Sequence, residues 1–347
     1  MEITFIEFIK NIISTPSLLF ITILMTAVMF ANGCTDVPNA IATCVSTRSL
    51  DAKKGFILAV VFNSLGVLVM ALVSSKVAET VFNIVNFGSD SSQNMTALAT
   101  ALIGIAIWSG ISWYFGIPSS QSHALLAGIS GAAIAIQGNI SGIDLNEWKL
   151  VLYGLFIVNI LAFLIGYITT KLVEKICKNM DRRKTNKFFK KTQIIGAATT
   201  CFMNGAQDGQ KFMAIFLLGI ALSRGVTETA NFEIPIWLMF YCSFIIAIGA
   251  IVGGIRIIKT VGTKVAKVER YQGTAADLSS AICLFGSSII GIPVSSTHTK
   301  NSAVMGVGAS RRLSNVNWKV AKSMVLTWII TFPCCGLLGF ILTKLFI

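Results

Sequence analysis

The sequence predicts an all-α polytopic membrane protein with two inverted repeats of about five transmembrane elements each. Composition is the first observation: 54% of the 347 residues are hydrophobic, 12% are charged, and the mean hydropathy is +0.76. Several apolar runs approach the roughly 20 residues that a helix needs to cross a bilayer. The short alternating segments of a membrane β-barrel are absent from the sequence. Two further observations are a pair of repeated motifs and a swap of loop charges between the halves.

Two polar motifs each occur twice. Asn32–Asp36 recurs as Asn204–Asp208, 172 positions later (208 − 36), and Gly116–His123 recurs as Gly291–His298, 175 positions later (298 − 123). Each motif places Gly or Pro and a polar cluster inside apolar sequence, which predicts broken or re-entrant helices at the motifs. Duplicated halves with discontinuous helices are typical of secondary transporters, whose binding site lies where the halves meet.

The predicted elements follow the same order in each half. The first carries the Asp motif, the second and third are apolar runs, the fourth begins at the Gly-Ile-Pro motif, and the fifth begins at a tryptophan suited to the membrane interface. The first apolar stretch has no basic segment before it and is interpreted as a transmembrane element, not a signal peptide. The elements are expected at about 16–47, 56–74, 96–115, 116–137 and 148–172, and at about 192–222, 236–258, 274–290, 292–308 and 319–345. The repeats are therefore 1–172 and 192–347, joined by a basic linker, 173–191.

Loop charges indicate that the second repeat is inverted. The loop 48–54 is basic, whereas its counterpart 223–235 holds Arg224, Glu228 and Glu233; the two other loop pairs show the same swap. Because basic loops face the cytoplasm, equivalent loops should lie on opposite sides of the membrane. An odd number of crossings per repeat gives this result. The linker 173–191 is then cytoplasmic and both termini lie outside.

Several function classes are not expected. The net charge of +13 comes from Lys and Arg in short loops, so it indicates membrane orientation and not a nucleic-acid partner. The eight cysteines include no CxxC, and only two histidines are present, so neither a metal centre nor a cofactor is predicted. Ser120 with His123 is the only hint of a catalytic pair, and that spacing is too common to indicate an enzyme.

The Asp motifs are candidates for binding the coupling ion. Asp36 and Asp208 are carboxylates inside apolar helices, where an acid is costly and usually functional. Gly33 and Gly205 would let the helix open and expose carbonyl oxygens, which together with a carboxylate suit Na⁺. Two other interpretations are that each Asp binds and releases a proton, or that it only caps a helix.

The Gly-Ile-Pro motifs are candidates for binding an anion. Polar side chains follow a proline that starts a helix well, and a helix N-terminus offers free N–H groups and partial positive charge. Two such cradles from inverted halves would enclose one tetrahedral oxyanion; the alternative is that the hydroxyls only cap helices or join them. The side chains concerned are Ser120, Gln121, Ser122, Ser295, Ser296 and Thr297.

The histidines and two lysines are supporting candidates. His123 and His298 are proton carriers, anion donors or, in the preferred interpretation, interior histidines that orient the cradle. Lys211 follows Asp208 by three residues, so it either pairs with a carboxylate, meets the anion or reaches the interface. Lys300 follows the second Gly-Ile-Pro motif closely.

At these residues the chain resembles the inorganic phosphate transporter (PiT) family, of the bacterial and archaeal low-affinity permease type. Gly33–Ala40 is similar to the family's Gly-Ala-Asn-Asp-Val-Ala-Asn-Ala signature, with Thr35 and Pro38 as departures. Gly205–Lys211 resembles the bacterial form of the second copy, and Pro293–His298 the downstream Pro-Val-Ser-Thr-Thr-His signature. The first downstream copy, Pro118–His123, is looser. The resemblance extends from about residue 18 to the end of the chain.

The resemblance implies inward phosphate transport driven by Na⁺ or H⁺, an inverted-repeat fold and a homodimer in the cell membrane. By position it implicates Asn39 and Gln210 in addition to the aspartates and the Ser/Thr triplets. The departures at Thr35, Gln207 and Gln121 leave the coupling ion open and leave room for the family's sulfate carriers.

The resulting hypothesis is a secondary active transporter that imports inorganic phosphate by cation symport through alternating access. A sulfate or broad oxyanion permease is the alternative, followed by an anion channel, which would need no coupling ion. Monohydrogen phosphate carries a P–OH that donates to a carboxylate, whereas sulfate has none, so contact between the anion and an aspartate would favour phosphate. The predicted anion ligands are the two triplets with Gln210 and Lys211. The predicted coupling-ion residues are Asp36, Asn39, Asp208, Thr35 and Gln207, with Na⁺ expected at Asp36 and Asp208. The supporting residues are His123, His298, Asn32 and Asn204.

Overall fold

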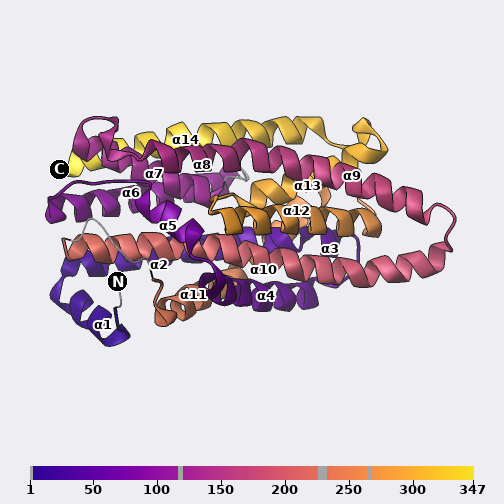
Figure 1. The fold of residues 1–347 in the computed structure, drawn as a ribbon, viewed down its shortest axis with the longest axis horizontal. Coiled ribbons are helices and arrows are strands. Elements are labelled where there is room, and N and C mark those ends of the chain that lie inside the picture. The colour runs from indigo at the N-terminus through magenta and orange to yellow at the C-terminus, as the bar shows by residue number, and fades with distance from the viewer. Residues whose placement is uncertain (1–2, 116–119, 226–232, 265–267) are drawn as a thin grey trace.

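The computed structural model describes residues 3–115, 120–225, 233–264 and 268–347, and these residues form a bundle of long helices (Figure 1). Within these ranges no β-strand occurs, and one isolated bridge joins Val85 to Ile143. Seven of the described helices are long and apolar enough to cross a membrane. The all-α polytopic class predicted from composition is confirmed.

The first half of the chain contains nine α-helices among the described residues. They are α1 (Phe5–Ser14), α2 (Pro16–Ala40), α3 (Ala42–Ser46), α4 (Ala52–Val73), α5 (Lys76–Asn83), α6 (Ser91–Phe115), α7 (Gln121–Gln137), α8 (Leu145–Tyr153) and α9 (Asn159–Cys177). One π-helical turn, Gly154–Val158, joins α8 to α9, so the two run on as one rod. The second half contains α10 (Arg182–Ser223), α11 (Ile236–Lys264), α12 (Arg270–Ile290), α13 (Ser296–Arg311) and α14 (Trp318–Phe346).

Most predicted elements correspond to these helices, with two additions and a longer α10. The short helices α1 and α5 are additional to the prediction, because each is too brief to give a transmembrane signal. The predicted linker 173–191 is helical at both ends: α9 runs to Cys177 and α10 begins at Arg182, capped by the Asp181 side chain. With 42 residues, α10 extends for about 63 Å.

The predicted helix breaks at the Asp motifs are wrong. In α10 the helix continues without interruption through Asn204–Lys211, and in α2 it continues through Asp36 and ends only after Pro38. Glycine has another purpose here: a Cβ on Gly205 would strike the Asn63 carbonyl oxygen of α4. The glycines therefore permit close helix packing and do not open the helix.

The break predicted at the second Gly-Ile-Pro motif is confirmed. After Ile290 the chain turns through Gly291, whose φ of 89° favours glycine, and α13 begins at Ser296. Helices α12 and α13 then pack against each other as a hairpin. The first copy of this break, residues 116–119, lies outside the described residues.

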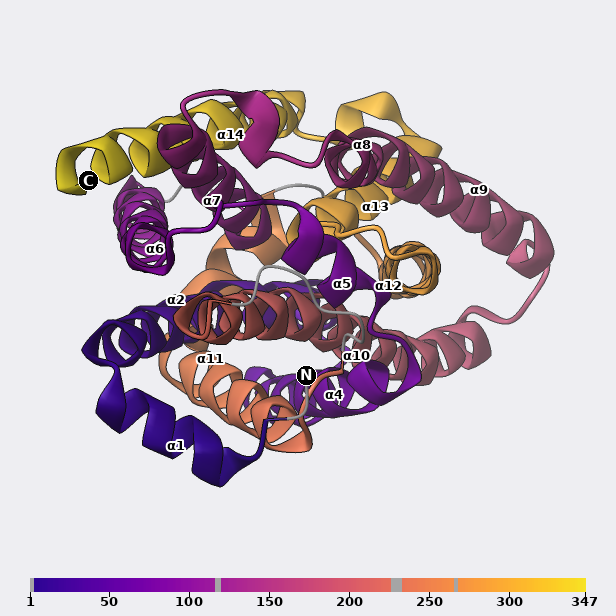
Figure 2. The same ribbon diagram turned by 60° about the vertical axis from the view of Figure 1, so that its left-hand side comes forward.

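Two groups of helices form the molecule, and each contains helices from both halves of the sequence. Figure 2 shows α1, α2, α4, α10 and α11 on one side and α6, α7, α8, α9, α13 and α14 on the other. Within the groups, α2 packs on α11 and α10 on α4, while α7 packs on α14 and α13 on α9. Each motif-bearing helix thus packs mainly on a helix of the opposite half. The outer faces of α4, α9 and α14 expose large apolar side chains such as Leu72, Ile160 and Ile329, as contact with lipid requires.

Candidate functional site

Asp208 is the centre of a buried cluster drawn from four helices. It lies midway along α10, and its Oδ1 accepts from Lys211 Nζ at 3.1 Å and Ser122 Oγ at 3.4 Å. Its Oδ2 accepts from Asn32 Nδ2 at 3.4 Å and Ser296 Oγ at 3.3 Å. Asn32 comes from α2, Ser122 from α7 and Ser296 from α13. The structure therefore joins residues of both Asp motifs and both Gly-Ile-Pro motifs in one place.

Lys211 uses all of its hydrogen-bond donors within this cluster. One turn beyond Asp208 on α10, its ammonium donates to Asp208, to Ser122 Oγ at 2.9 Å and to the carbonyl of Val294. These contacts use the three hydrogen atoms that an ammonium can donate. Of the open interpretations of Lys211, pairing with the carboxylate is the one this conformation shows.

Asp36 brings a second negative charge to the same region. It is buried on α2, within electrostatic range of Asp208 and Lys211 and beside Thr297. Among the described residues, neither Asp36 Oδ2 nor Thr297 Oγ1 has a hydrogen-bond partner. With both carboxylates and the ammonium ionised, the site would carry a net negative charge of one, and a buried charge of this kind favours the arrival of a cation.

Unpartnered oxygens accompany Asp36 along α2. Asn32 and Asn39 lie four residues before and three after it, on the same helix face, and both have a buried Oδ1 that accepts no hydrogen bond from the described chain. Carboxylate and amide oxygens are the hard ligands that alkali and alkaline-earth cations prefer. No group of three or more His, Cys, Asp or Glu side chains is placed to hold a metal ion in the described ranges.

The serines at the two helix starts divide into two roles. Ser120 and Ser295 cap α7 and α13: their Oγ atoms accept from the backbone N–H of His123 at 3.2 Å and of His298 at 3.3 Å. Capping was one of the open interpretations of the motif. The hydroxyls one or two residues later instead face Asp208, and both helix N-termini are thereby aimed at the buried cluster.

Two glutamines of the second Asp motif contact the protein itself. Gln207 Nε2 donates to Ser288 Oγ at 3.0 Å and to the Ile292 carbonyl at 3.3 Å, and its Oε1 accepts from Val294 N at 3.3 Å. Gln207 thus holds the turn that precedes α13. Gln210 Oε1 accepts from the N–H of Ala78 in α5 at 3.3 Å.

Three other predicted residues lie on α7, α2 and α10. Gln121 Oε1 accepts from Ser109 Oγ at 2.6 Å, and Thr35 Oγ1 donates to its own helix at Ala31 O. Asn204 is buried on α10 with an Nδ2 that finds no acceptor among the described residues.

His123 and His298 meet each other and not the aspartates. Their ring centroids are 4.7 Å apart in an edge-to-face arrangement; His298 stacks on Trp328 at 4.2 Å and His123 lies 4.8 Å from Phe332. Their ring nitrogens have no hydrogen-bond partner within the described structure. The geometry agrees with interior histidines that hold α7 and α13 together by aromatic packing.

A second buried ion pair joins Lys300, a supporting candidate, to Asp277, which was not predicted. It joins α12 to α13, and Thr43 Oγ1 donates to Asp277 Oδ1 at 2.8 Å. An acid inside the apolar run 274–290 is a usable signal. It is easily missed because the first half of the sequence has no counterpart to confirm it.

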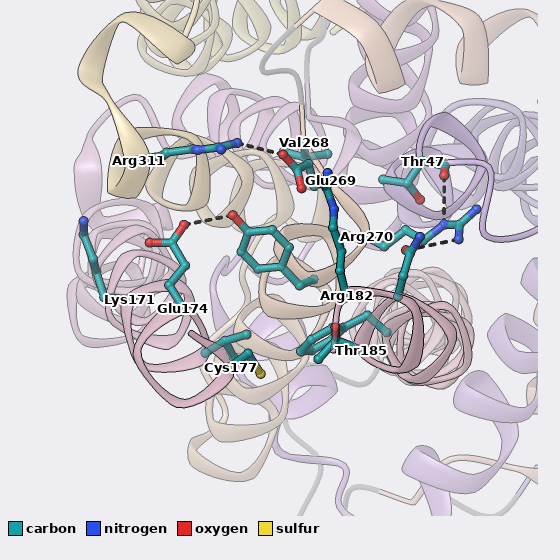
Figure 3. A pocket seen from close by; sticks show the side chains of 14 residues that line it. Thr47, Lys171, Glu174, Cys177, Arg182, Thr185, Val268, Glu269, Arg270 and Arg311 are labelled. Atoms are coloured by element: carbon teal, nitrogen blue, oxygen red, sulfur yellow. Dashed lines mark hydrogen bonds and ion pairs between the residues drawn. The ribbon is translucent and has the colours of Figure 1, made fainter. Parts of the chain in front are cut away.

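A cavity of about 850 Å³ opens where α9, α10, α12 and α13 approach one another (Figure 3). Its charged lining contains four basic and two acidic side chains. Both acids are engaged: Glu174 accepts from Tyr271 at 2.8 Å, and Glu269 pairs with Arg311 at 2.7 Å. The basic residues are Lys171, Arg182, Arg270 and Arg311. We call this cavity the basic mouth.

Comparison with known proteins agrees with this arrangement. The family model of the phosphate transporter family matches residues 32–339. A probable low-affinity inorganic phosphate transporter of Bacillus subtilis (strain 168) is 38% identical, covering 95% of this chain and 99% of the relative. One of Rhizobium meliloti (strain 1021) is 36% identical, covering 89% and 90%. A solved structure, described as "The sodium-dependent phosphate transporter", shares the fold, with a TM-score of 0.86, 23% identity and coverage of 96% and 99%. The chain therefore belongs to the phosphate transporter family.

Proposed function

We propose that this protein imports inorganic phosphate across the cell membrane by symport with a cation. The observation that carries the proposal is the buried cluster around Asp208, where hydrogen-bond donors from two helix starts and one lysine converge on carboxylates. Membership in a family of phosphate transporters supports phosphate as the cargo.

Asp208 occupies the place that the anion would take. Ser122, Ser296 and Lys211 all donate to its carboxylate in the conformation described. An entering phosphate would take these donors over, because they suit its oxygens equally well. Its P–OH would in turn donate to a carboxylate, an interaction that sulfate lacks, so we infer a preference for phosphate. Gln121, Thr297 and Gln210 remain proposed as further anion contacts.

The same exchange explains why a cation must travel with the anion. When phosphate removes the donors, Asp208 becomes a buried carboxylate with fewer partners, and the phosphate adds its own negative charge to a site that is already negative. Such a site is costly unless cations neutralise it. We propose Na⁺ as the coupling ion, held by Asp36 and Asp208 with oxygens of Asn32 and Asn39. The structural relative is a sodium-dependent phosphate transporter, which supports this choice. Thr35 and Gln207 are proposed to hold the cation site in shape.

We propose alternating access, which the arrangement of the two helix groups supports. The cluster lies where α2 and α10 of one group meet α7 and α13 of the other, and its polar side chains are buried. We propose that relative movement of the groups exposes the cluster first to one side and then to the other. The first repeat is proposed to be inverted relative to the second, with the basic α9–α10 connection in the cytoplasm. Figure 1 shows both termini at the opposite end of the molecule from that connection, which fits termini outside. A homodimer is the assembly that the family resemblance implies.

The test is uptake of labelled phosphate by proteoliposomes containing the purified chain. One arm imposes a Na⁺ gradient, a second imposes a proton gradient, and both are repeated with excess sulfate. Accumulation of phosphate on the Na⁺ gradient, unaffected by sulfate, is expected. Accumulation on the proton gradient alone would replace Na⁺ by H⁺; strong inhibition by sulfate would favour a broad oxyanion permease; equilibration without accumulation would indicate a channel and overturn the proposal.

A further inference from the structure

The Asp277–Lys300 pair is present in only one of the two sequence repeats. Counting back 175 positions, Asp277 corresponds to Leu102 (277 − 175) and Lys300 to Leu125 (300 − 175). All four side chains are buried. The equivalent sequence positions are therefore filled by two charges in one repeat and by two leucines in the other. Because a buried ion pair is rarely better for stability than a well-packed apolar pair, packing alone does not account for the charges.

The polarity of α10 shows the same asymmetry. Gln193 and Thr200, seven residues apart, share one face of α10 and lie 15 and 8 residues before Asp208 on the same helix. Their counterparts on α2, 172 positions earlier, are Ile21 (193 − 172) and Val28 (200 − 172), both buried and apolar. This stretch of α10 is thus polar at buried positions where the equivalent stretch of α2 is apolar.

This polar stripe is continuous with the ion pair. Lys300 lies one turn after Ser296 on α13, and Ser296 contacts Asp208. Asp277 accepts from Thr43, whose carbonyl accepts from Gln193 Nε2 at 3.2 Å. A chain of contacts therefore runs from Lys300, one helical turn from the central cluster, through Asp277 and Thr43 to Gln193.

The chain of contacts ends at the basic mouth. Gln193 Oε1 accepts from Thr47 Oγ1 at 2.8 Å, and the Thr47 carbonyl accepts from Arg270 Nε at 3.4 Å. Thr47 and Arg270 line the basic mouth, as Figure 3 shows. A surplus of basic side chains at the end of a narrow polar path attracts anions.

We propose that Lys300 is a second anion-binding residue, on the path between the central site and the basic mouth, and that Asp277 occupies it while the path is closed. Phosphate that leaves the central cluster displaces Asp277 from Lys300 and passes on to the arginines of the mouth. The equivalent positions of the other repeat, Leu102 and Leu125, are apolar and provide no anion-binding residue. The inference rests on the proposed phosphate transport and assigns its route on the side of the basic mouth.

The variant Asp277→Leu/Lys300→Leu tests the route without leaving a buried charge unpaired. Because leucines already fill the equivalent positions of the other repeat, we expect this double variant to fold. Phosphate binding to purified protein should stay within about twofold of wild type, whereas phosphate uptake by proteoliposomes should fall about tenfold or more. Lys319→Leu, which removes an exposed lysine from α14, is the matched control and should leave both unchanged. Uptake by the double variant at the wild-type rate would overturn the inference.

A native cysteine provides a second measurement that needs no change to the pair. Cys201 is buried beside Asp277 and Lys300, next to Thr200, whose hydroxyl donates to the Asp277 carbonyl at 2.9 Å. In a chain that keeps Cys201 as its only cysteine, an anionic thiol reagent should react about threefold faster when Na⁺ and phosphate are both present, because cycling opens the path. A chain that keeps only the buried Cys335 of α14 should show no such change. Equal rates for Cys201 with and without phosphate would overturn the route.

The wild-type arm separates the two proposals. Absence of phosphate uptake by the wild-type chain would remove the proposed function itself. Wild-type uptake together with an unimpaired double-leucine variant would remove only the route through Lys300.

Discussion

Replacing Asp208 by Asn keeps the shape of the side chain and removes its charge. In the native cluster Oδ1 accepts from Lys211 and Ser122, and Oδ2 accepts from Asn32 and Ser296. An amide supplies only one oxygen. If that oxygen keeps Lys211 and Ser122, the new NH₂ meets the Asn32 amide, which is also a donor, and only Ser296 can adjust by accepting.

The expected change in the free energy of unfolding follows from these contacts. Leaving one partner of a buried ion pair uncompensated costs about 3–5 kcal/mol, and a donor facing a donor costs about 1–3 kcal/mol more. Asp36 lies within electrostatic range of Lys211 and compensates part of the first amount. We therefore expect Asp208→Asn to lower the free energy of unfolding by about 3–5 kcal/mol in total.

Unfolding of purified protein and phosphate uptake by proteoliposomes measure the two consequences separately. The double variant Asp208→Asn/Lys211→Met removes both charges and should recover most of the lost stability, while uptake stays abolished in both. Asp51→Asn is the matched control, because Asp51 is an exposed cap of α4 and Asn caps a helix as well as Asp does. A single variant that is as stable as wild type would refute the pairing, and one that retains full uptake would refute the role of Asp208 in transport.

Three further predictions use neighbouring contacts. Gly205→Ala should lower the free energy of unfolding by about 2 kcal/mol or more, because the new Cβ strikes the α4 backbone. Gly286→Ala is the control, because its new Cβ meets nothing within 4 Å and should leave stability unchanged. Equal thermal shifts for the two variants would contradict the packing argument. Gln207→Leu should release the turn before α13 and lower stability by about 1–3 kcal/mol, measured by unfolding; an unchanged variant would show that the turn holds itself. Ser296→Ala should raise the KM for phosphate in the uptake assay with little loss of stability. Ser295→Ala should lower the free energy of unfolding by about 1 kcal/mol, because α13 loses its cap. The opposite result, a stability loss for Ser296→Ala and a KM change for Ser295→Ala, would show that the two serines have each other's role.

Hydropathy and repetition are sufficient to predict the long membrane helices and the convergence of the motifs. Apolar length locates a membrane helix because the bilayer imposes it. Repetition identifies Asp36 and Asp208 as partners, since two acids at matching depth are rarely accidental in apolar sequence. The structure places Asp208 with Ser122 and Ser296 in one cluster, as the meeting of two repeats would require.

The close helix packing, the second ion pair and the division of roles between the serines depend on information that one sequence does not hold. Gly205 is compatible with an opened helix and with a tight helix crossing, and only the position of α4 decides between them. Asp277 has no acidic counterpart in the other repeat, so a pattern of repeated polar residues indicates Lys300 only through its motif and does not include Asp277. The role of Ser295 as a cap, in contrast to Ser296, depends on where the helix begins within one residue.

The exchange of partners between halves constrains how the chain is made. When the ribosome has synthesised the chain as far as Ser223, α10 can pack on α4, but α2 still lacks α11, its main neighbour. A newly inserted first half therefore holds Asp36 and the close-packing face of α2 in the bilayer without their final cover. Completion of α11 gives α2 its main neighbour, and the later completion of α14 gives α7 its main neighbour, so each group is closed only by the last third of the chain. Chains that end before α11 would therefore leave α2, with its buried Asp36, without its main neighbour.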